Sequence, residues 1–145
     1  MAIEWTIESG SAVSPGQLAH ATTKLLGAVL GTAPDGVRID GDAEDFTLRV
    51  SFDEAEGAAE VTFDAHGDGD VWTTVTAYRT QLSAAVALVA AVALADLSGG
   101  ELSGPGLVRR YRGDLADLIA DLTPAGPDPV SNLSDRFGWT FLPPA

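Results

Sequence analysis

The longest run of apolar residues in this chain lies between Gln81 and Leu97, and it contains no charge between Arg79 and Asp96. The run is rich in Ala and Leu, which favour helix. Its large side chains would cover most of the circumference of a helix, and a helix that is apolar on all sides is a buried one. We therefore expect the rest of the chain to pack around it. The run is shorter than the roughly 20 apolar residues that cross a bilayer, which predicts no membrane span.

Two shorter patterns precede this helix. Residues Ala2–Glu8 alternate between apolar and polar side chains, which predicts a half-buried strand. The segment Ser14–Gln17 offers an N-cap serine, a proline in the first turn and a capping-box glutamine, so a helix is expected to begin there and to end at Gly31. Its apolar stripe consists of Leu18, Thr22, Leu25, Leu26 and Val29.

From Gly36 to Tyr78 the apolar residues recur at every second position, which predicts four strands. The segments between them, Gly41–Asp45, Asp53–Gly57 and His66–Asp70, are short and dominated by Gly, Asp and Glu, as hairpin loops are. An antiparallel meander with one face on the helices and the other in solvent is the economical interpretation.

The remainder of the chain carries weaker patterns. Leu107–Arg112 fits either a short edge strand or an irregular segment, and Leu115–Leu122 predicts a short amphipathic helix. Residues 123–145 form a Pro-rich linker and an aromatic tail with Phe137, Trp139 and Phe141 at alternate positions. Because large apolar side chains favour burial, we expect the tail to dock on the domain as a strand or a hydrophobic latch.

Together these elements predict an α+β fold in the order β-α-β-β-β-β-α-α. It consists of an antiparallel sheet of about five strands with two or three helices packed on one face. The length of 145 residues fits a single domain spanning residues 1–145. The expected core includes Leu25, Phe46, Val50, Phe63, Val75, Val86 and Val89.

The composition excludes several classes of partner and of chemical site. Twenty-one acidic residues against 8 basic ones give a net charge of −13, which disfavours nucleic acid and anionic membranes as partners. The absence of cysteine excludes disulfides, thiolate metal sites and thiol nucleophiles. The first residues show neither the basic nor the apolar segment of a signal peptide, so we expect a cytoplasmic protein.

The negative charge is concentrated between residues 40 and 70, where Arg49 is the single basic residue. Alternate loops of a meander lie at the same end of the sheet, so the loops Gly41–Asp45 and His66–Asp70 are expected to converge. With the adjoining strand ends they would form a partner-binding site made of Asp40, Asp42, Glu44, Asp45, Asp64, His66, Asp68, Asp70 and Trp72.

Three interpretations of this acidic site compete. A divalent cation would suit carboxylate oxygens. However, the segment from Asp40 lacks the EF-hand glycine at its sixth position and has Ser51 in place of the bidentate glutamate, so no metal ligands are predicted. The second interpretation is a recognition surface for a basic protein, with Trp72 and Tyr78 available as aromatic anchors if they lie on the solvent face. The third is a set of solvated loops without a partner, in a composition that reflects a high-GC genome.

Catalysis has little support in the sequence. His20 falls at the edge of a helix stripe, His66 has no nucleophile at a recognisable spacing, and no G-x-S-x-G or phosphate loop is present. No catalytic residue and no cofactor are therefore predicted. The basic cluster Arg109–Arg112 is expected to pair with the chain's own acids.

A row of small residues on the central helix adds a structural alternative. Ala84, Ala87, Ala91 and Ala95 permit a close approach of another helix. The partner is expected to be the helix at Leu115–Leu122, and a homodimer formed through this alanine face is the alternative.

In its size, acidity and expected α+β fold the chain resembles two classes of bacterial protein. These are the small acidic immunity proteins that neutralise toxins and the small acidic dimeric chaperones of secreted effectors, both of which act by covering a partner. The leading hypothesis is a non-catalytic module that binds a basic protein, including an immunity-type inhibitor of a toxin nuclease. The alternatives are a small-ligand or divalent-metal-binding domain and a dimeric chaperone or assembly subunit.

Overall fold

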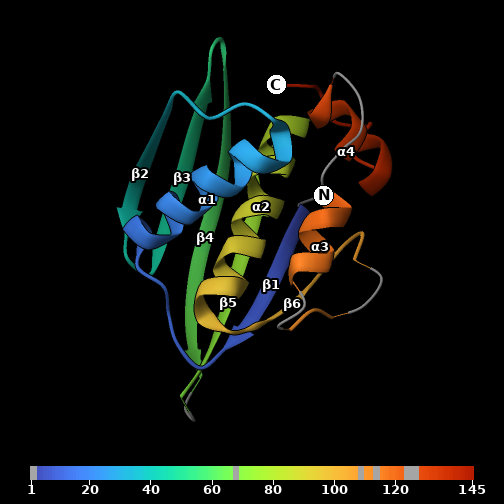
Figure 1. Ribbon diagram of the computed structural model, residues 1–145. Coiled ribbons are helices and arrows are strands. Elements are labelled where there is room, and N and C mark those ends of the chain that lie inside the picture. Colours follow the sequence, from blue (N-terminus) through green and yellow to red (C-terminus); the bar gives the residue numbers. More distant parts are fainter. Residues whose placement is uncertain (1–2, 67–68, 108–109, 113–114, 123–127) are drawn as a thin grey trace.

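The computed structural model describes residues 3–66, 69–107, 110–112, 115–122 and 128–145. Figure 1 shows a sheet with helices packed on one of its faces. The elements, in chain order, are β1 (Ile3–Ser9), α1 (Pro15–Leu30), β2 (Gly36–Asp42), β3 (Asp45–Phe52), β4 (Ala55–His66), β5 (Asp70–Ala77), α2 (Gln81–Ser98), β6 (Glu101–Ser103), α3 (Leu115–Leu122) and α4 (Pro129–Phe137).

The sheet has the strand order β2-β3-β4-β5-β1-β6, and every pair of neighbours is antiparallel. Strands β2 to β5 form the expected meander. Strand β1 then pairs with β5 on one side and with β6 on the other, so the first strand of the chain lies inside the sheet. The mixed α+β fold with an antiparallel sheet is thus confirmed.

Helix α2 is the centre of the core, as the apolar run predicts. Its residues from Leu82 to Ala95 are all buried, and it packs on β4, β5, β1 and α1. Strand β4 approaches it so closely that a Cβ added at Gly57 would lie 2.7 Å from Cγ2 of Val86. The buried hydroxyl of Ser83 also accepts a 3.0 Å hydrogen bond from the backbone N–H of Ala58.

The burial of α2 bears on two expectations. By length and composition this 18-residue helix does qualify as a membrane span, so its length alone does not exclude one, but 78% of it is buried inside the chain. The four alanines proposed as a homodimer face, Ala84, Ala87, Ala91 and Ala95, are also buried. A dimer through that face would require the fold to open.

Helix α1 begins as its sequence indicates. Ser14 is the N-cap, and its hydroxyl accepts a hydrogen bond from the backbone N–H of Gln17. The helix ends at Gly31, which adopts the left-handed conformation that glycine tolerates best. Leu25 is only partly buried, because it lies on the outer margin of the interface with α2 and lines a shallow groove there with Val92.

One strand differs from the sequence-based expectation. The sheet has six strands because the three residues Glu101–Ser103 form β6, a segment too short to show an alternating pattern. Of the two alternatives for Leu107–Arg112, an edge strand or an irregular segment, the described residues fit the second, with a single bridge between Tyr111 and Leu102; residues 108–109 are outside the described part of the chain.

The tail docks through a helix and a turn rather than a strand. Helix α4 begins at the N-cap Asp128 and ends at Gly138, so the alternation of aromatic residues arises where a helix ends. Trp139 is buried with its ring edge-on to Trp5 at 5.9 Å, and Phe137 stacks on Trp139. Phe141, in contrast, is 61% exposed. The linker residues 123–127 lie outside the described residues.

Candidate functional site

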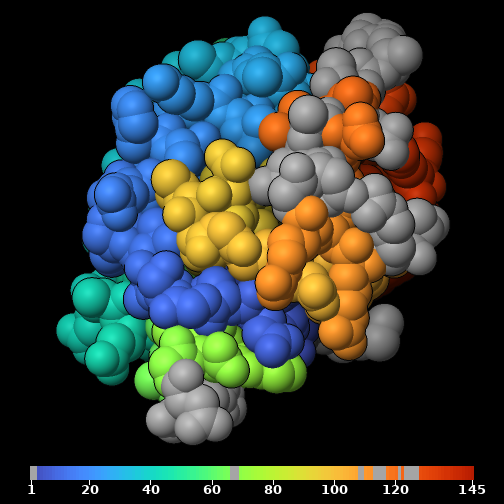
Figure 2. Space-filling model, turned by 60° about the horizontal axis from the view of Figure 1, so that its bottom comes forward, coloured from blue at the N-terminus to red at the C-terminus, as the bar shows by residue number. Residues whose placement is uncertain are grey.

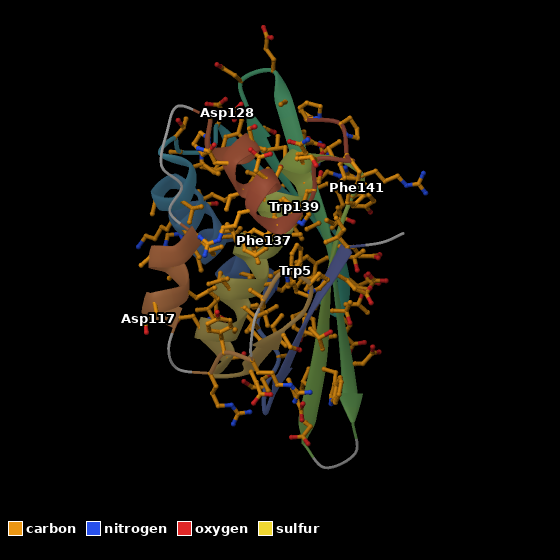
Figure 3. All side chains as sticks on the ribbon, turned by 90° about the vertical axis from the view of Figure 1, so that its right-hand side faces the viewer. Trp5, Asp117, Asp128, Phe137, Trp139 and Phe141 are labelled. Atoms are coloured by element: carbon orange, nitrogen blue, oxygen red, sulfur yellow. The ribbon has the colours of Figure 1, made fainter. Side chains whose placement is uncertain are left out.

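The sheet face opposite the helices carries no described helix, and we call it the open face (Figure 3). Successive side chains of a strand point to opposite faces, so each strand contributes every second residue to it. Strand β1 is the clearest case. Ile3, Trp5 and Ile7 are buried in the core. Glu4, Thr6 and Glu8 alternate with them and therefore lie on the open face.

The register arranges the open-face side chains in rows across the strands. One row is Asp40–Thr47–Glu60–Thr76–Glu4. The next is Asp42–Asp45–Thr62–Thr74–Thr6, and a third is Asp64–Trp72–Glu8–Glu101. Neighbours in a row are about 5 Å apart, which is the spacing of paired strands. The open face is therefore a regular array of carboxylates and threonine hydroxyls.

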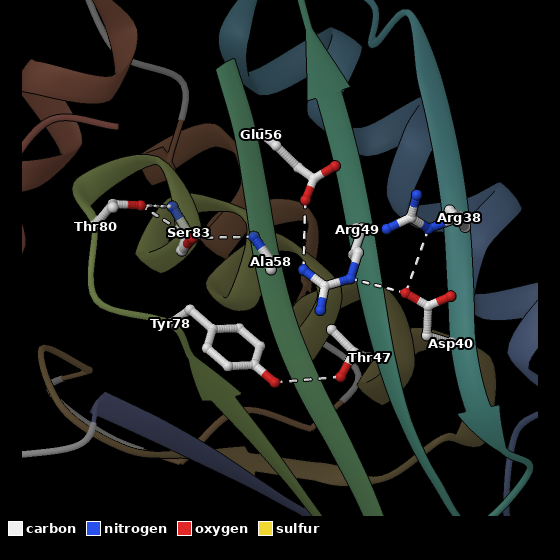
Figure 4. A network of polar contacts seen from close by, with 9 residues as sticks. All are labelled: Arg38, Asp40, Thr47, Arg49, Glu56, Ala58, Tyr78, Thr80 and Ser83. Carbon is white, nitrogen blue, oxygen red and sulfur yellow. Dashed lines mark hydrogen bonds and ion pairs between the residues drawn. The ribbon is translucent and has the colours of Figure 1, made fainter.

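Two arginines, Arg38 and Arg49, are the basic residues among the described strand positions of this face. The guanidinium of Arg49 donates to Asp40 at 2.8 Å and to Glu56 at 3.4 Å, and Arg38 also pairs with Asp40 (Figure 4). The hydrogen bond from Arg49 holds the pKa of Asp40 below its usual value, and the same contact raises the pKa of Arg49. The negative charges of Asp40 and Glu56 are thus paired with arginines, and we call Arg38, Asp40, Arg49 and Glu56 the compensated corner of the open face.

Among the described residues, no ion pair involves Asp42, Asp45, Glu60, Asp64 or Glu8. Glu101, at the end of the third row, pairs instead with Arg110 and Arg112. Asp42 and Asp45 lie directly opposite each other, an arrangement of like charges that is unfavourable. Burial raises the pKa of Glu60, and the charge and hydrogen bonding of nearby Asp45 raise it further. Thr62 contributes one weak hydrogen bond to Asp45. We call Asp42, Asp45, Glu60, Asp64, Glu8 and Trp72 the acidic band.

Trp72 occupies a particular position in this band. It lies between Asp64 on β4 and Glu8 on β1, directly opposite each of them, and its side chain is 43% exposed. A large indole surface held between two carboxylates on a rigid sheet suits a cationic side chain, because a cation can contact the ring and both acids at once. Tyr78, also 43% exposed, lies at the Arg49 corner, where its hydroxyl is 3.3 Å from that of Thr47.

Most residues of the sequence-based site lie on or beside the open face. Asp40, Asp42 and Asp45 flank the β2–β3 turn, and Glu44 is exposed in that turn. Asp64 and Trp72 face each other across β4 and β5, as do the backbones of His66 and Asp70. Asp68 and the side chain of His66 lie outside the described residues.

The two loops share one end of the sheet, but β4 and β5 extend beyond the β2–β3 turn. Asp45 pairs with Thr62, the carbonyl oxygen of Glu44 in the turn accepts a hydrogen bond from the N–H of Phe63, and β4 continues to His66. Three further strand residues therefore carry the β4–β5 hairpin about 10 Å past the β2–β3 turn. Figure 2 shows this end of the molecule, with the hairpin in light green and the turn in teal. The register therefore spreads the acids into a band along the sheet.

The sequence-based site omits Glu4, Glu8, Glu60 and Glu101, which complete the rows. The alternation of β1 already places Glu4 and Glu8 on its polar side, so a signal for them exists. What the sequence does not show is that β1 lies beside β5, and this pairing brings Glu8 next to Trp72.

The described residues show no cluster of side chains typical of a metal site. Within residues 3–66, 69–107, 110–112, 115–122 and 128–145, no group of three or more His, Asp or Glu side chains is placed to hold a metal ion. His20 is exposed on α1, away from the acidic band. The basic residues Arg110 and Arg112 contact Glu101 at the β6 edge, as expected for pairing within the chain.

The chain was compared with protein-family models, with curated proteins and with solved structures, and none of them matches it.

Proposed function

We propose that this protein is a non-catalytic binding module whose open face docks a basic protein. The observation that carries the proposal is the position of Trp72 between Asp64 and Glu8, in a sheet face that no described helix covers. Aromatic residues in the middle of polar surroundings are the usual anchors of protein interfaces. Here the two direct neighbours of Trp72 across the strands are both acidic, which favours partners of the opposite charge.

The electrostatics of the acidic band support a cationic partner. Burial raises the pKa of Glu60, and the nearby carboxylate of Asp45 raises it further, so the ionised form of Glu60 is unfavourably placed. A Lys or Arg side chain placed between the two carboxylates would favour their ionised forms. Because the acids lie on adjacent strands of one sheet, their backbone positions are fixed before binding, and little backbone entropy is lost in ordering them.

The class of partner that fits best is a toxin nuclease. Such an enzyme binds the phosphates of nucleic acid through a cationic site, and an acidic array on a flat sheet can cover that site as a competing polyanion. In this mode the protein acts as an immunity-type inhibitor. The inhibition is steric and electrostatic, and it requires no chemistry from the inhibitor.

A capture experiment with matched charge reversals tests the proposal. The native protein and the variants D45K/D64K and D96K/D117K are immobilised and exposed to native lysate at low and at high salt. The two variants change the net charge equally, but Asp96 and Asp117 are exposed on α2 and α3, away from the open face. We expect a basic protein to be retained at low salt by the native chain and by D96K/D117K and to be lost with D45K/D64K.

A further variant tests whether Trp72 is the anchor of the interface. Truncation of Trp72 to alanine is expected to weaken binding of the captured protein by about 2 kcal/mol or more, the usual effect of a central aromatic residue. Equal capture by all variants, or capture of acidic proteins only, would contradict the docking of a basic protein on the open face.

A further inference from the structure

A cavity of about 610 Å³ lies at the end of the sheet opposite the β4–β5 hairpin. It is bounded by the end of α1, the β3–β4 turn, the first turns of α2 and α4, and the C-terminal residues Pro144 and Ala145. These segments meet near the top of Figure 1. Its volume falls within the range of roughly 300–1,000 Å³ typical of small-molecule sites.

The floor of the cavity is apolar. Leu30 and Leu82 are buried there, and Phe52 and Val130 are partly buried beside them. The groups come from four elements that contact one another through the core, so the floor is formed in the absence of a ligand. An apolar body is the part of a ligand that such a floor would hold.

The rim of the cavity is acidic. Asp35, Asp53 and Asp128 line it, and the described residues of its lining include no Lys, Arg or His. Within the described residues, none of the three carboxylates forms an ion pair. Asp35 accepts a hydrogen bond from the backbone N–H of Asp53, and Asp128 accepts one from that of Ser131. These neutral donors leave the negative charge of the rim uncompensated.

The helix N-termini beside the cavity do not make it an anion site. The first backbone N–H groups of α2, those of Gln81 and Leu82, donate to the carbonyl oxygens of Pro143 and Pro144. The N–H of Ser83 donates to the hydroxyl of Thr80. Donors that would otherwise bind an anion are thus already used by the chain, and the carboxylates dominate the charge that a ligand would meet.

From the apolar floor and the uncompensated acidic rim we infer that this cavity binds a small cationic amphiphile, a molecule with an apolar body and an amine or guanidinium group. The apolar body would lie on Leu30, Leu82 and Phe52. The cationic group would lie at Asp35 and Asp53. This site is separate from the open face and does not depend on the function proposed for it.

Three probes of equal shape and different charge test the inference. They are 4-phenylbutylamine, 4-phenylbutan-1-ol and 4-phenylbutyrate, and their binding to the full chain is measured by titration with NMR observation of backbone amides. We expect the amine to bind several-fold more tightly than the alcohol, the carboxylate to bind least, and the shifts to centre on Ala55, Gln81 and Leu82.

Two double variants distinguish the effect of the rim carboxylates on binding from the effect of the overall charge of the chain. D35N/D53N keeps the hydrogen-bond acceptors, and asparagine tolerates the positive φ of 42° at residue 53. We expect it to weaken binding of the amine by roughly fivefold to tenfold, as two partly exposed charge pairs would. D96N/D117N removes the same charge elsewhere and should leave binding unchanged.

The following results would overturn the inference. They are failure of the amine to bind at millimolar concentration, equal binding of the amine and the alcohol, or equal losses in D35N/D53N and D96N/D117N. Shifts that lie on the open face instead of at the cavity would also overturn it.

Discussion

The two faces of the sheet are built from the same strands and obey different constraints. On β1 the residues Trp5 and Ile7 are fully buried, whereas their neighbours Glu4 and Glu8 lie on the open face. The covered face holds α2 in place, so its side chains are fixed by packing. On the open face, no described helix packs against the side chains, and their polar contacts are the exposed ion pairs and hydrogen bonds given above. We therefore expect substitutions on the covered face to change stability and substitutions on the open face to change the proposed binding.

The largest expected effect lies on the covered side. Leu88 is fully buried in α2, and its replacement by alanine removes buried apolar surface and leaves a cavity. We expect the free energy of unfolding to fall by about 2–5 kcal/mol, measured by urea denaturation. Thr74→Ala on the open face is the matched control, with an expected change within about 0.5 kcal/mol. Similar losses in both variants would mean that the two faces are not distinct.

A smaller effect is expected where the strand backbone touches the central helix. Gly57→Ala places a methyl group 2.7 Å from Val86 and 3.1 Å from Leu82, so α2 or β4 must shift. Overpacking of this kind costs about 1–3 kcal/mol. The same substitution at Gly36, where an added Cβ meets nothing within 4 Å, provides the comparison in thermal unfolding. An unchanged Tm in Gly57→Ala would contradict the close packing of β4 on α2.

Loss of Arg49, which pairs with Asp40 on the open face, is expected to destabilise the fold to an extent that depends on pH. Arg49→Met removes the partner that lowers the pKa of Asp40. A carboxylate with a lowered pKa in the folded state contributes stability above its ordinary value of 3.8 and loses it as the pH falls through the folded-state pKa. The Tm of the variant should therefore lie below that of the native chain at pH 7, with the gap narrowing below pH 3.8. A gap independent of pH would show that Arg49 acts through packing alone.

The smallest expected effect is a gain in stability, not a loss. Glu60 has a raised pKa, so its ionisation opposes folding at neutral pH and its protonation at low pH removes the penalty. Glu60→Gln should raise stability at pH 7 by no more than about 0.5 kcal/mol. The gain should disappear as the pH falls towards 4.5, the ordinary value for this group, because the protonated glutamic acid then resembles glutamine. A loss of stability at pH 7 would contradict the raised pKa of Glu60, which burial and the nearby Asp45 cause.

The sequence predicts the structure correctly where neighbouring residues along the chain determine it. The N-cap at Ser14, the end of α1 at Gly31 and the burial of the apolar helix all follow from neighbouring residues. Strand β6 could not be predicted because three residues show no periodicity. Helix α4 contains too few apolar residues for a stripe, and its start is marked mainly by Asp128 and Pro129.

The candidate site was predictable in part. The acids of the meander were identified from local composition, but their arrangement depends on two non-local facts. One is the register of Asp45 with Thr62, which lets β4 and β5 extend beyond the β2–β3 turn. The other is the insertion of β1 beside β5, which brings Glu8 to Trp72. The cavity at the opposite end joins residues from Leu30 to Ala145, and no sequence pattern relates segments so far apart.

The most direct test of the central claim is the dependence of the association rate on ionic strength for the captured basic protein. For the native chain and for D96K/D117K the rate constant should fall steeply between low and high salt, as electrostatic steering requires. For D45K/D64K it should be lower at low salt and should change much less with salt concentration. A salt dependence identical in all three chains would contradict docking on the acidic band.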